Sequence, residues 1–245
     1  MSRIHALIAS LMSLALTAAC GSTTAPAADA GADAAVDAAV DAAVDVAIDG
    51  PDIDAGVCGA DFFLTGAYED WDSTTNTFDG VEFATWTVRG EPTRTFTTNP
   101  NGRVELCIGR GHVSVIDATQ GDYQPAIYVT QPEVFDPPGL FFFQIKGIKT
   151  TRYASFFAEL GVTPDPARGH VLVQVMGTAR TLTLTGGGVP FAVDSSDDLT
   201  WTSGTIGGLV LFTNVTTGTS TLGGPVVGPT SLPVEAGKLT IVTVH

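Results

Sequence analysis

The sequence is poor in basic side chains. Its 245 residues include 11 Lys and Arg against 26 Asp and Glu, which gives a formal net charge of −15 at pH 7. Nucleic acids and anionic membrane surfaces are recognised through clustered Lys and Arg, and the sequence contains no such cluster. We therefore expect no nucleic-acid partner.

Residues that commonly carry catalysis are also few. The chain has four His and three Cys, and the motifs HExxH, GxSxG and a Gly-rich phosphate loop are absent. His112 and His170 each follow a glycine at an expected strand start, where a structural role is the more common one. We expect a protein that is not an enzyme and has no cofactor, and a hydrolase is the least favoured alternative.

The first 19 residues have the pattern of an export signal. Arg3 is followed by a mainly apolar run over residues 4–16 and by small residues at 17–19, as in a secretory signal with its cleavage site. The apolar run is shorter than the roughly 20 residues that a membrane-spanning helix needs. We expect segment 1–19 to be removed rather than kept as an anchor.

Residues 20–56 contain eight Asp and neither Lys nor Arg, and six of the Asp recur every fourth residue from Asp29 to Asp49. Low hydrophobicity and charge of one sign are typical of disordered segments. Carboxylates four residues apart would also repel one another in a helix. We expect a disordered, extended acidic linker over 20–56.

From residue 57 onward the pattern changes to short runs rich in Val, Ile, Phe and Thr. Gly, Pro, Asn or Asp interrupt these runs about every 8–12 residues, which is typical of antiparallel all-β sandwiches. One helix is expected at 152–160, where Tyr153, Phe156, Phe157 and Leu160 form a single apolar stripe. The expected strands are 62–68, 81–88, 94–98, 103–108, 112–117, 126–130, 140–145, 169–176, 181–184, 189–193, 209–215, 220–226 and 239–244.

The cysteines divide into Cys20 and a later pair, Cys58 and Cys107. The oxidising compartment of an exported protein allows a disulfide between this pair, which on the loop-entropy model would contribute about 4 kcal/mol. The alternative is two small buried thiols. No spacing of the CxxC or Cys/His type indicates a metal site.

Two acidic clusters are candidates for calcium, because carboxylate oxygens are its preferred ligands. They are Asp70 and Asp72 in the first cluster and Asp194, Asp197 and Asp198 in the second. A solvated loop tip is the more common meaning of such clusters.

Three tryptophans, Trp71, Trp86 and Trp201, are candidates for a sugar-stacking platform. Tryptophan in a β-sandwich more often packs in the core or at its rim. Both interpretations stay open on the sequence.

The junction Leu16-Thr17-Ala18-Ala19-Cys20 resembles a bacterial lipoprotein box. The resemblance implies that Cys20 becomes the acylated first residue of the mature protein, with the lipid bilayer as its partner. It also implies outer-membrane sorting, since Gly21 rather than Asp follows the cysteine. An ordinary signal peptide cut near Ala19 is the alternative.

The body of the chain resembles the carboxypeptidase regulatory-like module, a transthyretin-type (prealbumin-type) sandwich. The residues that carry the resemblance are Leu64-Thr65-Gly66, Asp79-Gly80-Val81, the turn and strand 97–106, and Tyr123-Gln124-Pro125, with a weaker second copy within 169–244. The resemblance implies tandem antiparallel β-sandwich modules at 57–138 and 167–245. A segment at 139–166 with the short helix would connect them.

The sequence therefore predicts a non-enzymatic, membrane-anchored lipoprotein of the bacterial cell envelope. Its sandwich modules would serve structural or adhesive interactions with an unknown protein or glycan partner, at the cell surface or the periplasmic face of the outer membrane. The alternative is a carbohydrate- or calcium-binding surface module on the same anchor.

Overall fold

A computed structural model describes residues 58–73, 79–135, 142–193 and 200–245, with no account of the side chains of residues 133, 135 and 142. All of these residues belong to one structural unit, Pro51–His245. The expected signal 1–19, Cys20, the linker 20–56 and the candidate ligands Asp194, Asp197 and Asp198 lie outside the described residues.

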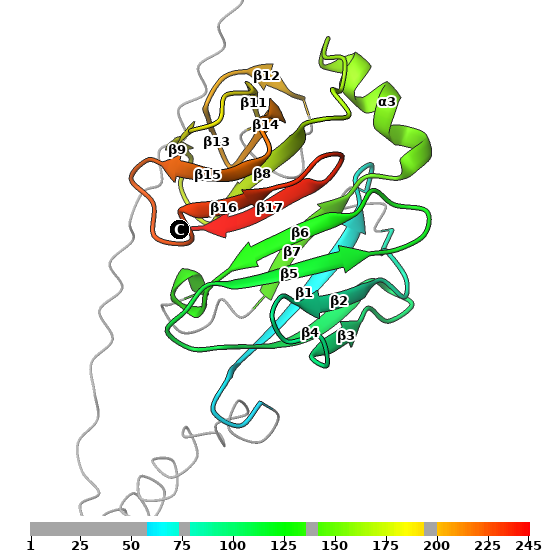
Figure 1. The fold of residues 1–245 in the computed structure, drawn as a ribbon, viewed down its shortest axis with the longest axis vertical. Helices are drawn as coiled ribbons and strands as arrows, with labels where there is room; N and C mark the ends of the chain where they lie inside the picture. The colour runs from blue at the N-terminus through cyan, green and yellow to red at the C-terminus, as the bar shows by residue number, and fades with distance from the viewer. Residues whose placement is uncertain (1–57, 74–78, 136–141, 194–199) are drawn as a thin grey trace, which may run out of the picture. The chain divides into compact units, whose positions relative to one another are not determined.

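The described chain is built mainly of strands, with a single α-helix and a 3-10 turn (Figure 1). In the first half the elements are β1 (Phe62–Asp70), β2 (Thr85–Val88), β3 (Thr95–Thr97), β4 (Arg103–Ile108), β5 (Ser114–Thr119), β6 (Ala126–Thr130), η1 (Pro132–Phe135), β7 (Phe142–Gly147) and α3 (Thr150–Glu159). In the second half they are β8 (Gly169–Val175), β9 (Arg180–Thr181), β10 (Thr183–Leu184), β11 (Val189–Val193), β12 (Thr202–Ser203), β13 (Ile206–Gly207), β14 (Leu209–Val215), β15 (Gly218–Gly223), β16 (Ser231–Val234) and β17 (Leu239–Val244).

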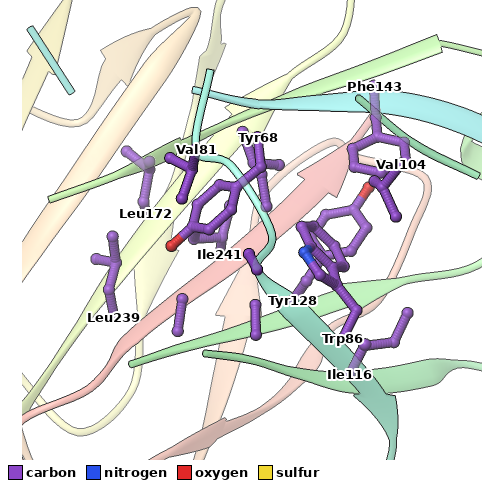
Figure 2. Close-up of a cluster of buried hydrophobic side chains, with 14 of the residues drawn as sticks. Tyr68, Val81, Trp86, Val104, Ile116, Tyr128, Phe143, Leu172, Leu239 and Ile241 are labelled. Atoms are coloured by element: carbon purple, nitrogen blue, oxygen red, sulfur yellow. The ribbon is translucent and has the colours of Figure 1, made fainter. Parts of the chain in front are cut away.

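A nine-stranded sheet is the central layer, in the order β12-β11-β14-β8-β17-β6-β5-β2-β3. The three-stranded sheet β4-β1-β7 packs on one of its faces, and side chains from both sheets form a shared core around Tyr68, Trp86, Tyr128 and Phe143 (Figure 2). The rings of Tyr128 and Phe143 stack with centroids 5.0 Å apart. These two sheets form the first sandwich.

A second core lies on the opposite face of the nine-stranded sheet, against the sheet β10-β15-β16. Strand β6 alternates between the two cores: Tyr128 belongs to the first, and Ile127 and Val129 belong to the second. All five residues of β6 and all six of β17 are buried. The middle strands of this sheet are thus covered on both faces.

The expected all-β sandwich class is confirmed, but the pairing departs from antiparallel at three places. Strand β17 lies between β6 and β8 and pairs parallel with both, so the last strand of the chain joins its two halves in one sheet (Figure 1). Strand β1 also pairs parallel with β7. The expectation of two separate antiparallel modules needs correction here, because the parallel pairing of β17 with β6 and β8 makes one sheet out of strands from both halves. Parallel strands of this kind are typically buried on both faces, as β6 and β17 are.

The single described helix, α3, lies close to its expected range of 152–160. Phe156 and Phe157 are its buried residues, as the apolar stripe predicts. Gly161 follows the helix with φ of 70°, and the N–H groups of Gly161 and Val162 bond to the carbonyls of Ala158 and Phe157. This is a Schellman C-terminus, which glycine favours.

Within the part of the chain that the structure describes, no helix combines the length and the apolar character needed to cross a bilayer.

Candidate functional site

An open groove of about 640 Å³ lies where β2 begins and β5 ends. Its lining residues are Phe83, Thr85, Thr119, Gln120, Gly121, Tyr123, Pro125 and Thr150. They come from the turn before β2, the β5–β6 connection and the first residue of α3, so three segments distant in sequence form its walls.

Thr85 and Thr119 form the strand part of the groove. They are direct partners in the β2–β5 register, and both are exposed. Directly opposite residues of neighbouring strands project on the same face of a sheet. The two hydroxyls therefore stand side by side at the groove.

The ring of Tyr123 is the most buried aromatic surface of the lining, at 7 % exposed. Its hydroxyl donates to Asp70 Oδ2 at 2.9 Å, and Lys149 Nζ lies 3.0 Å from the same oxygen. Burial acts to raise the pKa of Asp70, but hydrogen bonds from Lys149, the Asp72 backbone N–H and Tyr123 outweigh it and hold this pKa below its ordinary value. The pKa of Tyr123 is raised by burial and then by its bond to Asp70.

The loop that carries Tyr123 is held by backbone hydrogen bonds on both sides. Asp122 O accepts from Thr150 N at 2.8 Å, and Gln124 N donates to Ile148 O at 2.9 Å. The side-chain oxygen of Gln120 accepts from Asp122 N at 2.6 Å. These bonds fix the wall of the groove to the start of α3.

Phe83 stands at the rim of the groove in an unusual backbone conformation. It is 61 % exposed and has φ of 53°, a region that costs an L-residue about 1–2 kcal/mol. Thr98 holds both ends of the turn at residues 81–84. Its hydroxyl accepts a hydrogen bond from Ala84 N at 2.7 Å and donates one to Val81 O at 2.6 Å. The turn therefore holds a large exposed ring in a strained conformation that glycine would adopt more easily.

The chemistry of the groove is that of a binding surface. Its eight lining residues supply hydroxyls, one amide and two aromatic rings, and none of them is a carboxylate, imidazole or thiol. Nucleophilic and acid–base catalysis need such groups within hydrogen-bond reach of one another. Such a pair is not present among the eight lining residues.

The structure uses the first acidic cluster for ion pairs. Asp70 Oδ2 lies 3.0 Å from Lys149 Nζ, and Asp72 Oδ2 lies 3.1 Å from Arg152 Nε. Among the described residues, no group of three or more His, Cys, Asp or Glu is placed to hold a metal ion. In this structure each of the two carboxylates has a cationic partner.

The three tryptophans do not form an exposed platform. Trp86 is fully buried in the first core (Figure 2), and Trp71 is 2 % exposed. Trp201 stacks on Trp71 with ring centroids 5.8 Å apart, next to Phe156 of the helix. They are packing residues, and the groove aromatics Phe83 and Tyr123 are the ones that sequence reasoning did not single out as a site.

Cys58 and Cys107 form a disulfide in the structure, with Cα atoms 5.4 Å apart. Cys107 lies on β4 opposite Phe63 of β1, so the bond ties the segment before β1 to the neighbouring strand. Of the two histidines discussed above, His112 is exposed, whereas His170 is 1 % exposed and hydrogen-bonded to Tyr153.

Comparison with known proteins finds no matching family model and no matching curated protein. One similar solved structure is the Bacillus anthracis TIE protein, with 11 % identity and a TM-score of 0.26 over 75 % of this chain and 34 % of that chain. Another is GBS52, the minor pilin of the Gram-positive pathogen Streptococcus agalactiae, with 11 % identity and a TM-score of 0.22 over 74 % of this chain and 93 % of that chain. This chain thus spans 34 % of the length of the first, and superpositions at this level carry no functional argument.

Proposed function

We propose that the protein is a non-enzymatic lipoprotein of the bacterial outer membrane, anchored through acylated Cys20 and presenting its β-rich unit for structural or adhesive interactions. The sequence supports this through the export signal, the lipoprotein box and the acidic linker 20–56. Each buried methylene of an acyl chain contributes about 0.8 kcal/mol, so several chains together give a stable anchor.

The observation that carries the proposal is the position of β1, the first strand of the β-rich unit, within its sheet. Strand β1 is the middle strand of its sheet, with β4 on one side and β7 on the other. Hydrogen bonds in a sheet run across the strands, so a pull along β1 loads both ladders together rather than one bond at a time. The disulfide Cys58–Cys107 adds a covalent link at the end of β1 that the linker would pull on.

The linker gives the unit its reach. A flexible chain of about 36 residues has a root-mean-square span of about 35 Å, and repulsion between its Asp residues extends it further. A mainly acidic tether also keeps clear of an anionic membrane surface. This arrangement suits a unit that contacts a partner away from the bilayer.

Of the alternatives, a calcium-binding module is weakened, because Asp70 and Asp72 are paired with Lys149 and Arg152. A carbohydrate-binding module retains a candidate surface in the groove beside Phe83. An adhesive role and a carbohydrate-binding role are compatible on the same anchor.

Expression of the full chain in a bacterial host tests the anchor. We expect the protein in the outer-membrane fraction and a mature amino-terminal peptide with the mass of an acylated Cys20, while Cys20→Ser leaves the protein unacylated and soluble. Protease treatment of intact cells then reports whether the unit faces the medium or the periplasm. An unmodified terminus at residue 20 in the native chain would overturn the proposal.

A further inference from the structure

We propose that the groove binds a neutral oligosaccharide, with Phe83 as the apolar platform, Tyr123 as a rigid wall, and Thr85, Thr119 and Gln120 as hydrogen-bonding groups. The inference rests on the proposed adhesive function and names the ligand class of its contact surface. It places the sugar contact at the groove rather than at the three tryptophans, which were one candidate platform on the sequence.

The first argument is the strain at Phe83. An exposed side chain contributes little to the core, yet this position keeps a phenylalanine where φ is 53° and glycine would relieve the conformation. Backbone strain of this kind persists where the surrounding structure over-determines it, and Thr98 does so here through two hydrogen bonds. A large ring held exposed at a groove rim is suited to stack on the apolar face of a ligand.

The second argument is the preorganisation of Tyr123. Its hydroxyl is bonded to Asp70, and Lys149 Nζ lies 5.8 Å from the centre of its ring. Because the phenol is fixed at both its oxygen and its backbone, little side-chain freedom remains to be lost on binding. Since the ring is only 7 % exposed, it serves as a rigid wall of the groove rather than as a stacking face.

The third argument is the set of hydrogen-bonding groups that are free. Within the described part of the chain, the hydroxyls of Thr85 and Thr119 make no hydrogen bond. The oxygen of Gln120 is occupied by Asp122 N, which leaves its Nε2 amide with two donors. Hydroxyls and amides next to aromatic rings match a sugar, which presents an apolar face and a rim of hydroxyls.

Charge and backbone pairing disfavour other ligand classes. No lining residue is charged, so an anionic ligand finds no counter-charge among them. Lys149, which lies next to the lining residue Tyr123, is already paired with Asp70 at 3.0 Å and Asp79 at 3.5 Å. Strand β2 is bonded to β3 on one side and β5 on the other. An extended peptide therefore cannot add to β2 as a further strand.

The test uses the full-length protein in a detergent with a zwitterionic, sugar-free head group. Neutral oligomers of glucose, galactose, mannose and N-acetylglucosamine are screened on an array, with a peptide array in parallel, and positives are titrated by calorimetry. We expect binding of at least one neutral oligosaccharide series. Phe83→Gly should weaken it about tenfold or more, an effect equal to about 1.4 kcal/mol, and should not lower the thermal midpoint.

The hydroxyls are tested by Thr85→Val and Thr119→Val, which keep side-chain shape and strand preference, and each should weaken binding about threefold to tenfold. The matched control is Ile206→Ala on β13, which is 59 % exposed and outside the groove, and it should bind as the native chain does. The inference is overturned if no neutral oligosaccharide binds, if peptides bind in their place, or if Phe83→Gly binds as tightly as the native chain. None of these results changes the acylation of Cys20, which tests the anchor separately.

Discussion

The Nδ1 atom of His170 accepts a hydrogen bond from the backbone N–H of Asn214 at 3.2 Å. A backbone N–H can only donate, so Nδ1 carries no proton and the neutral ring is protonated on Nε2, which lies 2.7 Å from the Tyr153 hydroxyl. Burial lowers the pKa of His170 to about 4. The ring also packs on Phe157, with centroids 4.2 Å apart, and so links helix α3 to strand β8.

This relationship predicts an acid-sensitive stability. The unfolded chain binds a proton on His170 below its ordinary pKa of 6.5, whereas the folded chain does so only near 4. The contribution of neutral His170 to the free energy of unfolding should therefore be complete above about pH 6.5. On acidification to about pH 4, the free energy of unfolding should fall by about 3 kcal/mol. Urea unfolding between about pH 7 and about pH 4.5 measures the slope.

The control is His170→Asn, whose side-chain oxygen replaces Nδ1 as the acceptor for Asn214 N but does not titrate. The variant should be less stable near neutral pH and should lose this component of the slope. If the unfolding free energies of the native chain and the variant depended equally on pH, the assignment of the lowered pKa to His170 would be contradicted.

A second prediction concerns the ion pair of Glu69 and Lys146, which face each other in the parallel β1–β7 register. Their charged atoms are 3.0 Å apart, and the two residues are 3 % and 5 % exposed. Lys146→Met should destabilise the protein by about 3–5 kcal/mol, because it leaves a buried carboxylate without its cation. Glu69→Gln added to Lys146→Met should recover part of the loss in urea unfolding. A double variant as unstable as the single one would show that the charge of Glu69 is not the cause.

Local patterns in the sequence predicted most strands, because short apolar runs and the turn residues between them are local properties. The helix was predicted equally well from the stripe that includes Phe156 and Phe157. The edge pieces β12 and β13 were missed because two residues carry no period. Strand β16 was missed because Pro233 argues against a strand.

The long-range features of the fold and the conformation of Phe83 were beyond local patterns. The parallel pairing of β17 with β6 depends on strands more than a hundred residues apart in the chain, and their all-buried composition fits any central strand. The positive φ of Phe83 is imposed by Thr98 from another segment. The three tryptophans illustrate the same limit, since their residue type does not tell whether a ring packs inside or faces solvent.

A third prediction concerns the disulfide Cys58–Cys107, which closes a loop with a sequence separation of 49. On the loop-entropy model, replacing both cysteines by Ser should destabilise the protein by up to about 4 kcal/mol. Reductant should lower the urea midpoint of the native chain to that of the double variant and leave the variant unchanged. Alkylation with and without reductant, followed by mass measurement, reports the bond directly. A native chain that alkylates fully without reductant would contradict it.

The fourth prediction concerns Asn214, the other described non-glycine residue with positive φ, at 54°. It lies where the β14–β8 register shifts between Phe212 and Val215. Its side chain accepts from Asp165 N and donates to Thr163 O, both at 2.9 Å. The side chain of Asn214 thus links the segment after α3 to strand β14, while its backbone N–H donates to His170 Nδ1.

Two substitutions at this position separate the backbone from the side chain. Asn214→Gly keeps the positive φ without strain and loses two side-chain hydrogen bonds, which together contribute about 1–3 kcal/mol. Asn214→Ala loses the same bonds and in addition holds an alanine in the left-handed region, which costs about 1 kcal/mol more. Urea unfolding should therefore rank the native chain above Asn214→Gly and Asn214→Ala last. If alanine proved the better replacement, the left-handed conformation of residue 214 would be wrong, and with it the donor that fixes the tautomer of His170.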